Sequence, residues 1–74
     1  MSREAETPLE AARRYVMEQE TKIVQQQLLL RRLAAAGRST VKAERDLAAM
    51  DLALILLRGR VARLSGTARD DSAA

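Results

Sequence analysis

The chain of 74 residues has no cysteine and no histidine, and its one aromatic side chain is Tyr15. Without thiols no disulfide can stabilise the fold, and a structural zinc site would lack both of its usual ligand types. The scarcity of rings also leaves almost nothing on which nucleic-acid bases could stack. We therefore expect no metal, no cofactor, and a fold stabilised by packing of aliphatic side chains.

Residues suited to catalysis are equally scarce. The chain has no glycine-rich phosphate loop, and no serine or threonine has a recognisable base to activate it. Asp70 and Asp71 are adjacent carboxylates, but they lie in a stretch of small and polar residues that is typical of a solvated tail. The sequence predicts no catalytic residues and no enzymatic activity.

Proline and glycine are rare as well, so little interrupts helix formation. Thr7, Pro8 and Glu10 match a helix start, with threonine as the cap, proline at the first position and glutamate completing a capping box. Gly37 is placed to end this helix, and Gly66 to end a second one. The predicted organisation is a disordered N-terminus over 1–6, a helical hairpin over 7–66 with helices at about 8–36 and 41–64 around a turn at 37–40, and a disordered tail over 67–74.

Apolar residues follow the heptad spacing of packed helices in both predicted helices. The positions of this seam are Leu9, Val16, Ile23, Leu30, Ala43, Leu47, Met50, Leu54, Leu57, Val61 and Leu64. Because the chain reverses near Gly37, positions equally distant from the turn are expected to meet. The expected pairs are Leu30 with Leu47, Ile23 with Leu54, and Val16 with Val61. The predicted fold class is all-α, an antiparallel two-helix hairpin.

Two helices that meet along one seam bury too little apolar surface to offset the chain entropy lost on folding. Each helix carries a second apolar stripe, and both stripes are expected on the same side of an antiparallel hairpin. Packing two such faces together makes a four-helix bundle, so we expect a homodimer or a higher assembly. The expected interface residues are Met17, Val24, Leu28, Ala48, Leu52, Ile55 and Gly59.

Polar residues lie between the two seams, where a fully apolar core would not tolerate them. The hairpin register suggests three pairs, which are Glu20 with Arg58, Gln27 with Asp51, and Arg31 with Glu44. One interpretation is that these are interhelical pairs that fix the alignment of the helices. The other is that the side chains extend outward into solvent. Both interpretations, buried pairs or solvated charges, are compatible with the sequence.

A charged ridge on the first helix suggests an alternative function. Arg14, Lys22, Gln25 and Arg32 share its outward side. A dimer of hairpins would present two such ridges, and this architecture resembles that of Rop-type plasmid copy-number proteins, which bind RNA. The resemblance implies an RNA-binding or DNA-binding regulator. Glu18 interrupts the ridge, so a solvated charged face is the competing interpretation.

The segment 23–64 resembles a group of short, uncharacterised bacterial helical-hairpin proteins. Four motifs carry the likeness, namely Leu30-Arg31-Arg32-Leu33, Gly37-Arg38-Ser39-Thr40, Ala43-Glu44 and Leu47-Ala48-Ala49-Met50. The resemblance implies a bacterial helical hairpin. It implies no particular activity, because the group has none to transfer.

No apolar run approaches the roughly 20 residues that span a bilayer, and the first residues are polar and charged, unlike a cleavable signal. A cytoplasmic location is therefore expected.

Four leucines, Leu29, Leu33, Leu56 and Leu57, fall outside the expected dimer interface. They suit the docking of another protein, or the completion of a tetramer. The sequence thus favours a small homo-oligomeric interaction, scaffold or regulatory module that binds another protein and performs no catalysis.

Overall fold

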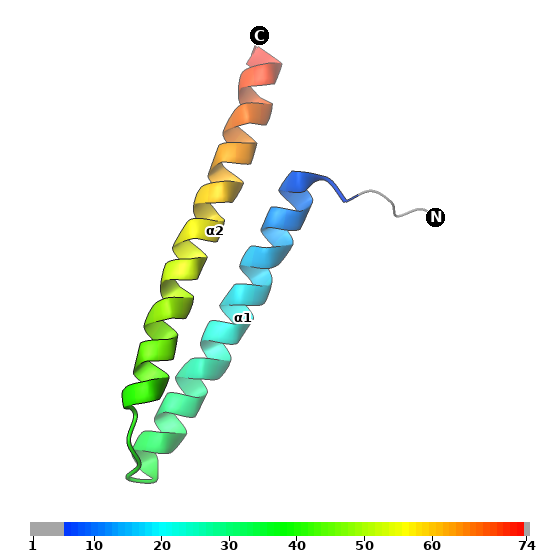
Figure 1. The fold of residues 1–74 in the computed structure, drawn as a ribbon. Helices are drawn as coiled ribbons and strands as arrows, with labels where there is room; N and C mark the ends of the chain where they lie inside the picture. Colours follow the sequence, from blue (N-terminus) through cyan, green and yellow to red (C-terminus); the bar gives the residue numbers. More distant parts are fainter. Residues whose placement is uncertain (1–5, 74) are drawn as a thin grey trace.

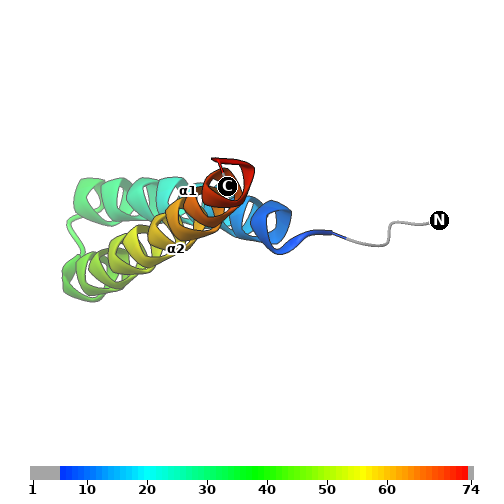
Figure 2. The ribbon, with the colours of Figure 1, turned by 90° about the horizontal axis from the view of Figure 1, so that it is seen from above.

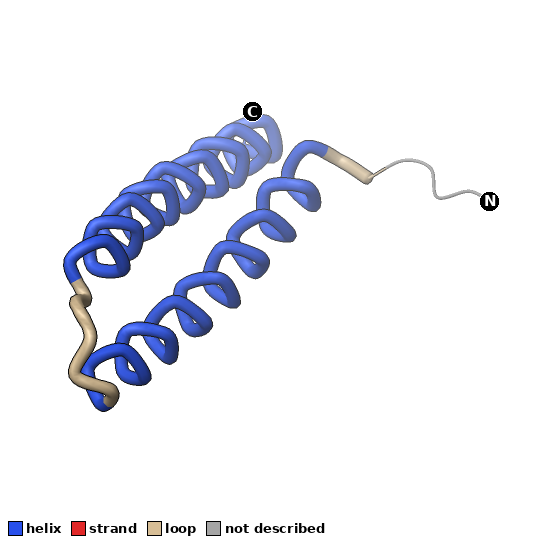
Figure 3. Tube along the Cα trace, turned by 60° about the horizontal axis from the view of Figure 1, so that its bottom comes forward, coloured by secondary structure: helices blue, strands red, loops and turns tan. Residues whose placement is uncertain are grey.

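The computed structural model describes the backbone of residues 6–73 and the side chains of residues 6–66. It contains two helices, α1 (Pro8–Ala35) and α2 (Val41–Ala73), which run antiparallel side by side (Figure 1). A short loop joins them at one end (Figure 3), and residues 6–73 include no strand. The predicted all-α hairpin is confirmed.

The start of α1 follows the predicted capping pattern. The backbone N–H of Glu10 donates to the Thr7 hydroxyl at 3.1 Å, and the N–H of Thr7 donates to the Glu10 carboxylate at 2.9 Å. Pro8 occupies the first helical turn, where its missing N–H costs nothing. Two N–H groups that the helix leaves unpaired are thereby satisfied.

The turn is built around Gly37, whose φ of +70° is the left-handed conformation that glycine adopts without strain. The N–H of Arg38 donates to the carbonyl of Leu33 at 2.8 Å, and the N–H of Gly37 donates to that of Ala34 at 3.0 Å. This pair of bonds is a Schellman motif, which satisfies carbonyls at the end of α1. Glycine therefore ends the helix as predicted, and Ala35 is its last residue.

The end of α2 differs from the expectation. The pattern predicted an end near Leu64 and an exit at Gly66, but the helix continues to Ala73, into the predicted tail. Gly66 does not adopt a positive φ, and no proline follows it, so nothing in this stretch stops the helix. As a result α2 extends beyond the start of α1 (Figure 1). The predicted disorder at 1–5 and at 74 lies outside the described residues.

The buried side chains follow one seam between the helices. All the predicted seam positions are buried or half-buried, and Ile23 and Ala43 expose only 8% and 5% of their surface. The heptad register is therefore confirmed, although the individual apolar pairs stay predictions. A second column on α1, three residues after each predicted position, completes the seam. Its members are Ala12, Gln19, Gln26 and Leu33, all buried or half-buried.

The hairpin is long and only one helix thick. Its principal extents are 58 × 30 × 13 Å, and its radius of gyration is 17.1 Å, against about 11 Å for a compact domain of this length. Each helix has one neighbour, and no third element in residues 6–73 covers either side of the pair (Figure 2). Neither helix is long and apolar enough to cross a membrane within the described residues. Large parts of both helices therefore face solvent.

Candidate interaction surface

The expected interface residues lie on the outside of the hairpin. Among the large side chains of this set, Met17 and Ile55 are the most exposed, at 67% and 63% of their surface. Val24, Leu28, Leu52 and Ala48 are also exposed, whereas Gly59 is half-buried. The most informative feature of this surface is that large aliphatic side chains are exposed to water on both helices. Covering each of them would lower the free energy of the protein.

Of the four leucines assigned to partner docking, two serve the hairpin itself. Leu33 and Leu57 are half-buried at seam positions, so they are not free for a partner. Leu29 and Leu56 remain exposed, Leu56 to 65%. The surface outside the expected dimer interface is accordingly smaller than the sequence suggested.

One of the three predicted polar pairs forms. Arg58 Nη2 on α2 donates to Glu20 Oε2 on α1 at 2.8 Å, which joins the helices across the surface. Both side chains are about half-exposed, so the pair is solvated and contributes little stability. It does support the antiparallel register from which the sequence predicted it.

The other two predicted pairs do not form among residues 6–66. Neither Gln27 with Asp51 nor Arg31 with Glu44 is joined by a hydrogen bond or ion pair, and these four residues are exposed. The Glu44 carboxylate instead accepts a bond of 2.8 Å from the Thr40 hydroxyl, one turn earlier. For these residues the interpretation as solvated side chains holds.

Two glutamines that the sequence interpretation passed over hold the helices together. Gln19 Nε2 donates to the carbonyl of Met50 at 3.1 Å, and Gln26 Nε2 donates to that of Ala43 at 3.0 Å. Seven residues forward on α1 thus correspond to seven residues back on α2, which is the antiparallel heptad register. An apolarity search overlooks these positions; their spacing from the seam residues was the signal that could have identified them.

A groove beside the Glu20–Arg58 pair links the seam to the expected interface. It is lined by Arg13, Val16, Met17, Arg58 and Val61. Val16 and Val61 belong to the seam, and Met17 belongs to the outer stripe. Along this groove, apolar surface is therefore continuous from the seam to the outer stripe of α1.

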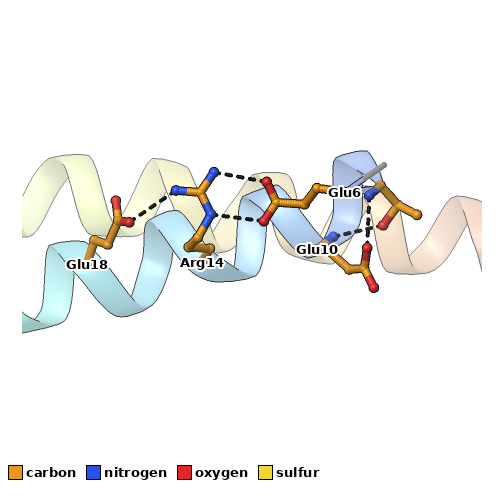
Figure 4. Close-up of polar contacts among 5 residues, drawn as sticks. Glu6, Glu10, Arg14 and Glu18 are labelled. Carbon is orange, nitrogen blue, oxygen red and sulfur yellow. Dashed lines mark hydrogen bonds and ion pairs between the residues drawn. The ribbon is translucent and has the colours of Figure 1, made fainter. Parts of the chain in front are cut away.

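A charged cluster at the start of α1 ties the preceding residues to the helix (Figure 4). The Arg14 guanidinium donates two bonds to Glu6, at 2.9 and 3.0 Å, and a third to Glu18 at 3.1 Å. It also lies 4.8 Å from the centre of the Tyr15 ring. These bonds, first those to Glu6, raise the pKa of Arg14, and the same contact lowers the pKa of Glu6.

This cluster bears on the charged ridge of α1. Two carboxylates already balance the Arg14 charge, whereas Lys22, Gln25 and Arg32 are exposed. A nucleic acid would have to compete with Glu6 and Glu18 for the guanidinium. Nucleic-acid binding through this ridge stays a prediction.

The described part of the chain holds no cluster of side chains suited to a metal ion. Residues 6–66 contain no group of three or more histidine, cysteine, aspartate or glutamate side chains that could hold a metal ion. They also leave no buried side-chain nitrogen or oxygen atom without a hydrogen-bond partner. The exposed apolar stripes on both helices are the feature of residues 6–66 from which a function is argued below.

Comparison of this chain with protein-family models, with curated proteins and with solved structures gives no match.

Proposed function

We propose that the chain is a non-catalytic helical interaction module, which works as a homodimer of hairpins and binds another protein. The observation that carries this proposal is an imbalance of burial. Within residues 6–66 three residues are buried, and two of them are alanine, while nine larger apolar or aromatic side chains each expose 41% or more of their surface. A hairpin with so little buried and so much exposed apolar surface would gain stability by packing its outer side chains against another protein chain.

The magnitudes favour assembly. Covering one large aliphatic side chain contributes about 1.5 to 3 kcal/mol, and each hairpin exposes Val24, Leu28, Leu52 and Ile55 on its outer stripes. The net stability of a domain is itself only about 5 to 15 kcal/mol. Association with a second copy can therefore decide whether the hairpin is stably folded.

A dimer leaves apolar surface for a further protein. Leu29 and Leu56 are exposed and lie outside the proposed dimer interface, so an amphipathic helix of a partner could pack against them. The resemblance to short bacterial hairpin proteins and to Rop-type dimers supports placing such a module in the bacterial cytoplasm.

Size-exclusion chromatography with light scattering tests the self-association. The wild-type chain is expected to elute at micromolar concentration with about twice its mass of 8.2 kDa. Leu52→Asp should lose the dimer and much of its helicity, since a charge would face the second copy. Gln25→Asp is the matched control, because it adds the same charge at an exposed position off the stripe. A wild-type chain that is fully helical and monomeric contradicts the proposal.

A further inference from the structure

The outer stripe of α2 has a feature that the isolated hairpin does not explain. Gly59 lies in the interior of α2 without a positive φ. A methyl group there would meet only the far end of the Arg63 side chain, at the ordinary contact distance of 3.5 Å. Glycine weakens a helix interior relative to alanine, so the hairpin alone gains nothing from it. A glycine at this position would, however, allow the backbone of a second helix to approach α2 closely.

Large apolar side chains lie directly beside this gap. Leu52 and Ile55, two turns and one turn before Gly59, expose 58% and 63% of their surface. Ala48 and Ala62, on the same stripe at seven residues on either side of Ile55, are small and exposed. Large residues at the centre with small ones towards the ends make a surface that can pack against a reversed copy of itself.

Charges along the edge of this stripe indicate the orientation of the second copy. Asp51 and Arg58 are one heptad apart, so they lie on the same side of α2. Asp51 is exposed and makes no hydrogen bond or ion pair with residues 6–66. If two α2 helices ran parallel about a two-fold axis, the edge that holds Asp51 and Arg58 would lie on opposite sides of the contact in the two copies, so Asp51 and Arg58 of the two copies would not meet. If they run antiparallel, with the two-fold axis near Ile55, each Asp51 lies beside an Arg58 of the other copy, whose guanidinium contacts Glu20 through Nη2 and is still 60% exposed.

We infer that α2 packs antiparallel against α2 of a second copy, with Ile55 near the two-fold axis, Leu52 directed towards Gly59 of the other copy, and Asp51 paired with the other copy's Arg58. This arrangement rests on the proposed self-association and specifies which helices meet and in which direction. It leaves the outer stripe of α1 outside the α2 contact.

Single cysteines test the arrangement cleanly, because the natural chain has none. Ile55→Cys, near the axis, should be cross-linked to its copy by a short bis-maleimide. Val41→Cys occupies an equivalent, exposed position on the same stripe. It lies about 20 Å along α2 from the axis, so two copies would be about 40 Å apart in the antiparallel dimer. We expect efficient cross-linking of Ile55→Cys and at least about tenfold less of Val41→Cys.

The outcomes separate the two proposals. A monomeric wild-type chain overturns self-association and this inference together. A dimer in which both cysteines cross-link shows parallel α2 helices, and a dimer in which Ile55→Cys does not cross-link shows contact elsewhere. Either result overturns the inference alone.

Charge exchange tests the edge contacts independently. Asp51→Arg and Arg58→Asp each set like charges together in a homodimer, and each should weaken dimerisation about tenfold. Arg58→Asp also removes the contact with Glu20 within each hairpin, so the helicity of this variant is measured beside its dimerisation. In a mixture of the two variants every edge pair is attractive again, so heterodimers should predominate. A mixture that forms no more heterodimer than random exchange would show that these side chains do not meet.

Discussion

At the scale of single residues, Gln19 and Gln26 show how a polar side chain can occupy a seam position. Both are half-buried, and both donate to carbonyls of α2. Those carbonyls already accept the regular bonds of their helix, so each glutamine adds a bond where none was missing. Such a bond contributes about 0.5 to 1.5 kcal/mol net, and it also fixes the alignment of the two helices.

Replacing Gln26 by alanine is expected to lower the free energy of unfolding by about 1 kcal/mol, through the lost bond to Ala43 and lost packing. Gln25→Ala is the control, because Gln25 is exposed and its replacement should change stability by less than about 0.5 kcal/mol. Urea denaturation followed by circular dichroism measures both. Equal effects of the two substitutions would show that the bond to α2 contributes nothing.

The contact between Glu6 and Arg14 predicts a shifted titration. Because the guanidinium favours the carboxylate, the pKa of Glu6 lies below its ordinary value. The contribution of the contact to stability is therefore complete above the ordinary glutamate pKa and is lost as the pH falls through the lowered one. Carboxyl chemical shifts in NMR should show this lowered midpoint, and Arg14→Gln should return it to the ordinary range. An unchanged midpoint in that variant would contradict the assignment.

At the scale of elements, both ends of α1 follow local rules that the sequence displays. Thr7 and Glu10 cap the start, and Gly37 ends the helix through its φ of +70°. The end of α2 was not predictable in the same way. A glycine is required only where the backbone turns left-handed, and Gly66 continues as helix. Its presence alone does not say which of these two conformations it takes.

The requirement at Gly37 can be measured against that at Gly66. Gly37→Ala is expected to cost about 1 kcal/mol or more of stability, because alanine is strained at a positive φ. Gly66→Ala should raise stability by up to about 1 kcal/mol, since it lies in a helix with nothing within 4 Å of the added methyl. Thermal or chemical denaturation distinguishes the signs, and a gain in stability from Gly37→Ala would contradict the turn.

The surface was predictable only in part. Heptad spacing alone places Leu52 and Ile55 on the outside, and the pairing of Glu20 with Arg58 follows from the register. The pairing of Gln27 with Asp51 does not form, and both side chains are exposed to solvent. Gln19 was overlooked because a search for apolar residues ignores a long amide whose methylenes pack and whose head group bonds to backbone.

At the scale of the whole molecule, a rod 13 Å thick buries few large side chains by itself, and among residues 6–66 Ile23 is the only large one that is buried. If assembly supplies the missing burial, the melting temperature must depend on protein concentration. We expect the melting temperature, followed by circular dichroism, to rise when the protein concentration is increased about a hundredfold. For Leu52→Asp the rise should be smaller, if that variant retains its helices. A wild-type melting temperature that stays constant over this range would indicate a self-sufficient monomer.

The thinness of the hairpin has a further consequence for the rate at which its backbone amides exchange hydrogen for deuterium. In a hairpin one helix deep, the amides are hydrogen-bonded within their helices but no second layer covers the outer faces, so a docked neighbour would slow exchange further by stabilising the part of the helix that it covers. A map of exchange rates along α1 and α2 would therefore trace the footprint of the neighbour. Amides beneath Leu52 and Ile55 should be the last to exchange, and dilution should release them first.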